Sequence, residues 1–298
     1  MNTQVEKINK SKVWIMASRP RTLLAAFVPV IVGTSVAFYD SKANILAAFI
    51  ALVCSILIQV GTNFVNDLYD YLSGADSINR KGPKRVLVSG FISVSEMKFA
   101  ILFVFGITFI LGLYLVYISS YITLLIGIFS IIAGIVYTAG PFPLAYNGLG
   151  DIFVFLFFGI IGTVGTYYVQ AVQFSSLSFW ASIPVGGLIT NILVVNNYRD
   201  IDEDRLAKKY TLAVKLGKTF SRFQFLFLFV LSFIILFIIY FNFKQSLFVF
   251  LPVISLPLVI KVVRMIFTLE GEKLNKTLEL TAKLSAIFGL LLAIGIVL

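Results

Sequence analysis

The chain contains no histidine, one cysteine and few charged residues. Without histidine it has no imidazole base, no histidine-ligated metal and no Ser-His-Asp triad. Cys54 has no partner for an intrachain disulfide and lies in an apolar run, so we interpret it as a small buried hydrophobic residue. The chemistry of the chain must therefore be sought among its carboxylates, amides and basic side chains.

The scarcity of charge is matched by an excess of apolar residues. Only 13% of the 298 residues are charged, 59% are hydrophobic and the mean hydropathy is +0.98. Soluble domains carry about 25% charged residues, so this composition indicates an integral membrane protein. The N-terminus has no small-residue cleavage site after a short apolar core, so we expect the first apolar segment to remain as an anchor.

Nine windows are long enough to cross about 30 Å of hydrocarbon as helices. The least distinct boundary is at Tyr121, which follows the preceding window after only two serines. The eighth window contains two prolines and two basic residues, and eight or ten spans would also be acceptable. The predicted fold is an all-α membrane protein with about nine transmembrane helices in one bundle, a single domain covering 1–298. The windows are roughly 22–39, 43–65, 97–118, 121–139, 151–172, 177–198, 223–241, 246–268 and 279–298.

Loop charge predicts the orientation of these helices. Of the 24 Lys and Arg residues, all but Lys42 and Lys244 fall in or beside the N-terminus and the loops after the second, fourth, sixth and eighth windows. We therefore expect these segments in the cytoplasm and, with nine spans, the C-terminus outside. The net charge of +10 is explained by this topology and by attraction to anionic headgroups, so no nucleic-acid partner is expected.

Two related polar clusters end the second and sixth windows, which run in the same direction. The segment NDLYD at 66–70 aligns without a gap with NNYRD at 196–200. Spacings of three and four residues place each cluster on one helical face, so the two clusters can meet at one depth. The first cluster consists of Asn63, Asn66, Asp67 and Asp70, with Asp76 further along, and the second of Asn196, Asn197, Asp200, Asp204 and Lys208.

The acids in these clusters need a cationic partner. Solvation at the membrane interface would explain a single aspartate at a helix end. A cluster is different, because acids near a helix C-terminus oppose the macrodipole and also repel one another. Carboxylate and amide oxygens suit Mg²⁺ or Ca²⁺ and are poor ligands for zinc or copper. Because Mg²⁺ commonly binds through a few carboxylates plus substrate phosphates, the clusters indicate a Mg²⁺-bridged diphosphate.

Basic residues border both clusters, and most of them are interpreted as topology or headgroup residues. Four lie beside a turn or an acidic stripe and are candidates for binding the diphosphate: Arg19, Arg21, Arg85 and Lys208. The others are Arg80, Lys81, Lys84, Arg199, Arg205 and Lys209.

These motifs resemble those of the UbiA-type intramembrane prenyltransferases, nine-helix proteins that join an isoprenyl diphosphate to an acceptor. NDLYDYLSGAD is similar to the first Asp-rich motif of the family, and NNYRDIDEDRLAKKYTLAVKLG to the second. RPRTLLAAFVPVIVGT, YTAGPFPLAYNGLGDIFVFLFFG and LTAKLSAIFGLLLAIG most resemble the members that prenylate 1,4-dihydroxy-2-naphthoate in menaquinone synthesis. The family carries an acid where this chain has Gly74, and Asp76 is expected to take its part.

The resemblance implies Mg²⁺-dependent transfer of a polyprenyl group from polyprenyl diphosphate to 1,4-dihydroxy-2-naphthoate in a prokaryotic cell membrane. Pyrophosphate and CO₂ would leave, giving demethylmenaquinol, while Arg21, Arg85 and Lys208 stabilise the leaving pyrophosphate. Tyr137 would line the cation or acceptor site, and Asp151 would orient the acceptor or act as a base. The implied metal ligands are Asn66, Asp67, Asp70, Asp76, Asn197, Asp200 and Asp204, with Asn63 and Asn196 as additional candidates. The implied catalytic residues are Asp70, Asp200, Lys208, Tyr137 and Asp151.

Two alternatives remain open at the level of sequence. The acceptor could be 4-hydroxybenzoate, homogentisate or a glycerol-phosphate lipid. The acidic stripes could instead bind the coupling cation of a transporter at a repeat interface. A transporter usually has its site near the midplane, whereas these clusters lie at helix ends on one side, which favours an interfacial site.

Overall fold

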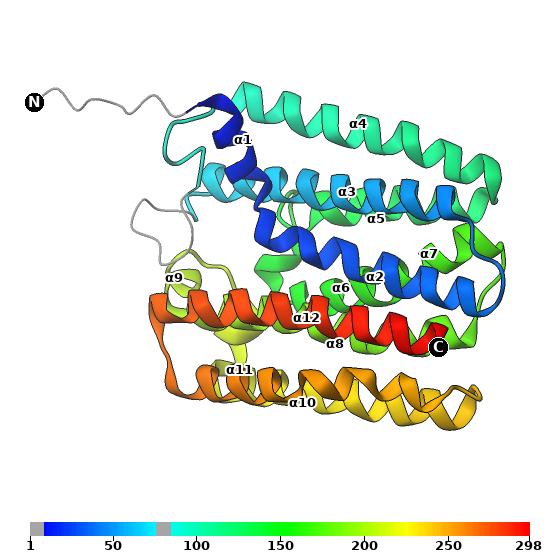
Figure 1. Ribbon diagram of the computed structural model, residues 1–298. Helices are drawn as coiled ribbons and strands as arrows, with labels where there is room; N and C mark the ends of the chain where they lie inside the picture. Colours follow the sequence, from blue (N-terminus) through cyan, green and yellow to red (C-terminus); the bar gives the residue numbers. More distant parts are fainter. Residues whose placement is uncertain (1–8, 76–84) are drawn as a thin grey trace, which may run out of the picture.

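A computed structural model of the protein describes residues 9–75 and 85–298, except for the side chain of Arg21. Within these ranges all regular structure is helical. The long helices lie side by side along one direction (Figure 1). The described chain begins with α1 at one end of the bundle and finishes at the other, as an odd number of crossings requires.

Each of the nine predicted windows coincides with a helix or a composite helical segment of the described chain. Eight segments are long and apolar enough to cross a membrane, and α5 is apolar but shorter. The prediction of an all-α membrane fold is therefore confirmed. The single helices are α2 (Pro20–Tyr39), α3 (Ile45–Leu72), α4 (Val94–Ile118), α5 (Tyr121–Val136), α8 (Ser176–Arg199), α10 (Leu212–Asn242) and α12 (Leu274–Val297).

Two crossings are composite, and four short helices lie outside the crossings. The fifth crossing joins α6 (Gly150–Val154), the π-helix η2 (Phe155–Ile161) and α7 (Gly162–Ala171). The eighth joins the 3₁₀-helix η3 (Leu247–Ser255) to α11 (Leu256–Thr268), which accommodates its two prolines. The short helices are α1 (Lys10–Ser18), η1 (Leu144–Asn147), α9 (Ile201–Leu206) and η4 (Gly271–Lys273).

Polar caps explain where several membrane helices begin. The first N–H groups of a helix have no partner inside it, and an unpaired group is costly in lipid. Asn44 accepts a hydrogen bond from the Ala47 N–H, Ser93 forms a capping box with Glu96, and Ser120 accepts from the Ile122 N–H. A connection of two serines is therefore sufficient between α4 and α5.

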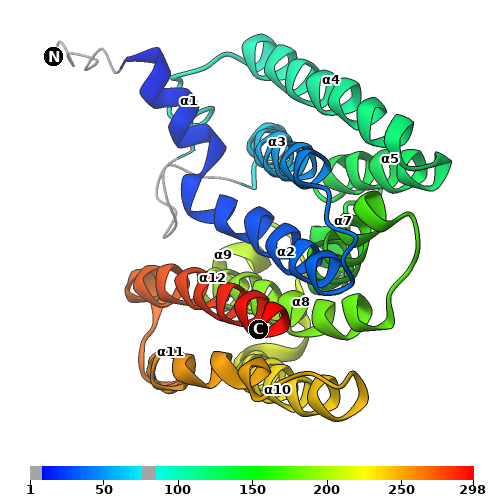
Figure 2. The same cartoon turned by 45° about the vertical axis from the view of Figure 1, so that its right-hand side comes forward.

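The buried side chains form two groups of helices. The larger group packs residues of α2, α7, α8, α10, η3, α11 and α12 together, and smaller clusters join α1, α3, α4 and the end of α5. Figure 2 shows α3, α4 and α5 on one side and α8, α10, α11 and α12 on the other, with α2 and α7 between. The core is thus divided, which leaves room for a cavity.

Backbone contact at glycine holds the π-helix η2 against α8. A Cβ atom on Gly186 of α8 would lie 2.8 Å from the Phe155 carbonyl oxygen and 3.1 Å from the Gly159 Cα. Membrane helices gain stability from such close packing, because lipid tails are as apolar as the helix surfaces. The wide turns of η2, a feature that recurs at functional sites, are thereby fixed on one wall of the bundle.

We expect the Gly186→Ala substitution to destabilise the detergent-solubilised protein by about 1–3 kcal/mol, because its methyl group overlaps backbone atoms. Gly106→Ala on α4 is the control, since a Cβ there has no described atom within 4 Å. Thermal unfolding of both variants checks this expectation. A Gly186→Ala protein as stable as the Gly106→Ala protein would contradict the packing described.

Candidate functional site

A cavity of about 910 Å³ lies between the two groups of helices. At the end of the bundle where α3 and α8 finish, it is lined by Asp67, Asp70, Asp200 and Asp204, and we call this the acidic end. Toward the opposite end its lining is mostly apolar and comes from α2, α3, α4, α5, η2 and α7. One cavity therefore joins a charged compartment to a long apolar one.

The α1–α2 junction is held at the acidic end by Asn63. Its Nδ2 donates to the Ser18 carbonyl (2.9 Å) and to Thr22 Oγ1 (3.1 Å). Arg19 lies between these two residues in a left-handed conformation (φ 51°), and it lines the cavity. Asn63 thus positions the segment that carries Arg19, and the cavity also includes Asn63 in its lining.

Asp67 and Asn66 point to different partners from the same helix α3. Asp67 is buried, and its Oδ2 accepts a hydrogen bond from the Val86 N–H (3.3 Å). Its Oδ1 is also buried but accepts no hydrogen bond from the described residues. The Asn66 side-chain oxygen accepts a hydrogen bond from Thr138, just beyond α5. Asp67 therefore retains acceptor capacity at the cavity.

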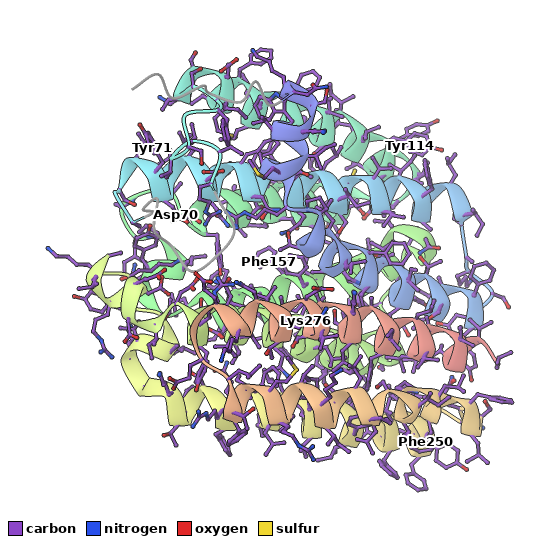
Figure 3. The ribbon with its side chains drawn as sticks, turned by 60° about the vertical axis from the view of Figure 1, so that its left-hand side comes forward. Asp70, Tyr71, Tyr114, Phe157, Phe250 and Lys276 are labelled. Atoms are coloured by element: carbon purple, nitrogen blue, oxygen red, sulfur yellow. The ribbon has the colours of Figure 1, made fainter. Side chains whose placement is uncertain are left out.

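Asp70 is bound by two side chains that come from separate segments. Arg85 Nη2 donates to Asp70 Oδ2 (3.0 Å), and the Tyr146 phenol donates to Asp70 Oδ1 (2.7 Å). Both members of the Asp70–Arg85 ion pair are buried. Figure 3 shows Asp70 on the side of α3 that faces the interior, with Tyr71 on the outer side and Phe157 deeper between the helices.

Tyr146 also connects the two acidic clusters, although the sequence motifs did not single it out. It belongs to η1, and its ring lies under Lys209 Nζ, 5.5 Å from the ring centroid. Lys209 Nζ in turn lies 3.6 Å from Asp204 Oδ1, and the Tyr146 carbonyl accepts from the Tyr210 N–H. The η1 segment therefore links the end of α3 to the segment after α9.

The second cluster contains a buried ion pair between neighbours in sequence. Arg199 Nε and Nη2 donate to the two oxygens of Asp200, at 2.6 and 2.7 Å. The same guanidinium donates to the side-chain oxygens of Asn196 (2.8 Å) and Asn275 (2.6 Å). Arg199 is 3% exposed, so it is a buried counter-ion of Asp200 and not a headgroup residue. Asn196 contributes to holding it.

Asp204 keeps an unused oxygen at the cavity. Its Oδ2 is buried and accepts no hydrogen bond from the described residues. Burial, followed by the negative charges of Asp200 and Asp70, raises the pKa of Asp204 to about 6, although Lys209 opposes this shift. A bound cation would favour the ionised carboxylate, so the surroundings of Asp204 suit a positively charged ligand.

The structure separates Lys208 from the other predicted residues. Lys208 adopts a left-handed conformation (φ 54°) after α9, its side chain is exposed, and it does not line the cavity. Lys209 lines the cavity instead, because the backbone turns at Lys208. Asp76, Arg80, Lys81, Lys84 and the side chain of Arg21 lie outside the described residues, so their assignments remain sequence-based predictions.

Tyr137 and Asp151 line the cavity next to the acidic end, since the residue after Tyr137, Thr138, is bonded to Asn66. Asp151, in the first turn of α6, is 4% exposed, and its Oδ1 accepts a hydrogen bond from Gln224 Nε2 of α10 (3.2 Å). A Cβ on Gly150 would lie 3.0 Å from the Tyr137 hydroxyl, so this glycine leaves space for the phenol. Both side chains line the cavity, and Asn197 lines it from α8.

The donor set at the acidic end fits a hydrated divalent cation. Among the described residues no three His, Cys, Asp or Glu side chains form a ready-made metal cluster. Mg²⁺ does not require one, because it usually retains several waters and binds through one or two carboxylates plus substrate phosphates. Asp67 Oδ1 and Asp204 Oδ2 are the buried carboxylate oxygens that remain available among these residues.

Comparison with known proteins relates this arrangement to one family. The sequence model of the UbiA prenyltransferase family matches residues 26–287. A 1,4-dihydroxy-2-naphthoate octaprenyltransferase from Escherichia coli (strain K12) is 34% identical over 298 residues, covering 98% of this chain and 97% of the relative. A protein of the same name from Bacillus subtilis (strain 168) is 28% identical over 296 residues, covering 99% of this chain and 95% of the relative.

A solved structure shows the same fold. The structure of a UbiA homologue from Archaeoglobus fulgidus bound to DMAPP and Mg²⁺ matches with a TM-score of 0.66. The alignment covers 95% of this chain and 98% of that one, at 17% sequence identity. Since the family match extends over most of the chain, the chain belongs to the UbiA prenyltransferase family, and it is a multi-pass integral membrane enzyme that transfers prenyl groups.

Proposed function

We propose that this enzyme transfers a polyprenyl group from a polyprenyl diphosphate to 1,4-dihydroxy-2-naphthoate, giving demethylmenaquinol, pyrophosphate and CO₂. The observation that carries the proposal is the cavity that joins buried carboxylates and cations at one end to an apolar compartment at the other. A polyprenyl diphosphate has the same division into a charged head and an apolar tail. The acceptor is proposed from the printed function of relatives such as those from Escherichia coli and Bacillus subtilis.

The diphosphate head would bind at the acidic end. Arg19, Arg85 and Lys209 line the cavity there and would neutralise part of the phosphate charge. When bound, Mg²⁺ would supply further charge neutralisation for the leaving pyrophosphate. The residues proposed to hold it are Asp67 and Asp204, through their available oxygens, together with Asn66, Asp70, Asn197 and Asp200, and with Asp76 included from the sequence motif.

The apolar compartment would hold the prenyl tail and exclude water from the reacting carbon. Departure of pyrophosphate breaks the allylic C–O bond and leaves positive charge on the allylic carbon. Tyr137 lines the cavity next to Thr138, which is bonded to Asn66 at the acidic end, and the face of an aromatic ring stabilises a cation. A low-dielectric surrounding strengthens this interaction and protects the cation from hydrolysis.

The acceptor would lie beside Asp151. Gln224 engages Oδ1 of this buried carboxylate, which fixes its orientation and leaves Oδ2 to accept a hydrogen bond from a naphthoate hydroxyl. The electron-rich ring would attack the allylic carbon, and the carboxylate of the acceptor would leave as CO₂. Asp151 would thus orient the acceptor or accept its proton.

We also propose that the acidic end faces the cytoplasm of a prokaryotic cell. The distribution of Lys and Arg over alternate loops supports this orientation. It would give a water-soluble aromatic acid and the diphosphate head direct access to the mouth of the cavity, while the prenyl tail stays at membrane depth.

An assay of isolated membranes tests the function. With octaprenyl diphosphate and Mg²⁺, we expect prenylation of 1,4-dihydroxy-2-naphthoate with release of pyrophosphate and CO₂, and no product after the divalent cation is chelated. The matched reactions contain 4-hydroxybenzoate, homogentisate or a glycerol-phosphate lipid as acceptor. Preference for one of these acceptors, or turnover without divalent cation, would contradict the proposal.

The Tyr146→Phe substitution tests the link between η1 and the acidic end. It removes the phenol that donates to Asp70 but retains the ring under Lys209. Loss of a hydrogen bond that orients a metal-binding carboxylate typically weakens metal affinity about 10–100-fold. We therefore expect the Mg²⁺ concentration for half-maximal rate to rise by that factor, with Mn²⁺ binding weakened in parallel and thermal stability largely unchanged.

Tyr71→Phe is the matched control for this substitution. Tyr71 follows Asp70 directly but its side chain is exposed, on the outer side of α3 (Figure 3). The Tyr71→Phe protein should retain the wild-type dependence of its rate on Mg²⁺ concentration. If Tyr146→Phe also retained it, Tyr146 would not position Asp70 for metal binding.

A further inference from the structure

The apolar compartment has a pair of glycines in its wall. On α4 the lining includes Thr108, Gly112 and Leu115, and these spacings place them on one helical face. On α5 it includes Leu124 and Gly127, which lie on one face for the same reason. Each helix therefore presents a glycine next to larger residues of the cavity wall.

Gly112 and Gly127 lie at the same level of the cavity. The helices α4 and α5 are in contact and are joined by Ser119 and Ser120 alone. Gly112 precedes Ser119 by seven positions, and Gly127 follows Ser120 by seven. At 1.5 Å per residue, both glycines lie about 10 Å from the connection along their antiparallel helices.

Packing does not explain either glycine. A Cβ built on Gly112 or Gly127 would have no described atom within 4 Å. Gly134, further along α5, is different, because a Cβ there would collide with the Thr62 hydroxyl. The space beside Gly112 and Gly127 therefore belongs to the cavity, and a side chain at either position would occupy it.

We propose that Gly112 and Gly127 determine the length of prenyl donor that the enzyme accepts. This inference rests on the proposed function. Gly127 lies ten residues from Tyr137, about 15 Å along the helix axis. The tail of a short donor such as geranyl diphosphate remains between these two levels, whereas the tail of octaprenyl diphosphate must pass the glycine pair. The absence of side chains at this level keeps the passage open.

The experiment compares two donors in three variants. Gly112→Leu and Gly127→Leu each introduce a side chain at the shared level, and Gly106→Leu on α4 is the matched control. A Cβ on Gly106 also has no described atom within 4 Å, but this residue does not line the cavity. The measurement is kcat/KM for geranyl and octaprenyl diphosphate with 1,4-dihydroxy-2-naphthoate as acceptor.

We expect the ratio of kcat/KM for octaprenyl to geranyl diphosphate to fall at least about tenfold in Gly112→Leu and Gly127→Leu, a discrimination of the size that pocket shape provides. The ratio in Gly106→Leu should equal that of wild type. If a leucine variant fails to insert, the double substitution Gly112→Ala/Gly127→Ala adds two methyl groups at the same level and should shift the ratio in the same direction.

The possible outcomes separate this inference from the function on which it rests. An active wild type with an unchanged donor ratio in the cavity variants would overturn the role of the glycine pair alone. An equal loss of rate with both donors would overturn it as well, because the substitution would then act on the protein as a whole. A wild type that transfers neither prenyl group to the acceptor would contradict the proposed function and the inference together.

Discussion

Four aspartates from two segments far apart in sequence share one buried compartment at the end of a membrane helix bundle. Asp67 and Asp70 come from the end of α3, and Asp200 and Asp204 from the end of α8 and from α9. Buried carboxylates repel one another and lose hydration, so they require compensating cations. Arg85, Arg199 and Lys209 supply part of this compensation from three further positions of the chain.

These cations do not engage every carboxylate oxygen of the compartment, and the oxygens that remain indicate what the site can bind. Arg85 and Arg199 bind Asp70 and Asp200 closely, whereas Asp67 and Asp204 each retain a buried oxygen without a hydrogen bond from the described residues. In the interior of a membrane protein such groups usually face a ligand or a partner. The acidic end is therefore suited to a ligand that brings its own positive charge, such as a divalent cation with a diphosphate.

The rest of the bundle keeps this compartment connected to an apolar one. The larger helical group packs tightly around α8, partly through backbone contact between Gly186 and η2. The group formed by α3, α4 and α5 contacts it through α2 and α7, and the cavity lies between the two groups. Close helix packing thus fixes one wall of the cavity, and glycines leave space in the other wall.

Periodicity made much of this predictable, because the helical repeat is a local property of sequence. It placed Asn63, Asn66, Asp67 and Asp70 on α3, and hydropathy located every crossing. It did not identify Tyr146, because the contact of this residue with Asp70 depends on how η1 packs against the end of α3. It also did not identify the ion pair between Arg199 and Asp200. It selected Lys208 by continuing the four-residue helical spacing from Asp204, but α9 ends at Leu206 and Lys208 is left-handed, so Lys209 lines the cavity instead.

The measurement that tests this account most directly is Mn²⁺ binding, followed by paramagnetic resonance in the presence of pyrophosphate. It compares the wild type with Asp204→Asn and with Asp202→Asn, a control on α9 whose side chain is exposed. The account predicts that Asp204→Asn weakens Mn²⁺ binding at least about tenfold, whereas Asp202→Asn binds as the wild type does. Wild-type affinity in Asp204→Asn would contradict the claim that the buried carboxylates of the acidic end hold the cation.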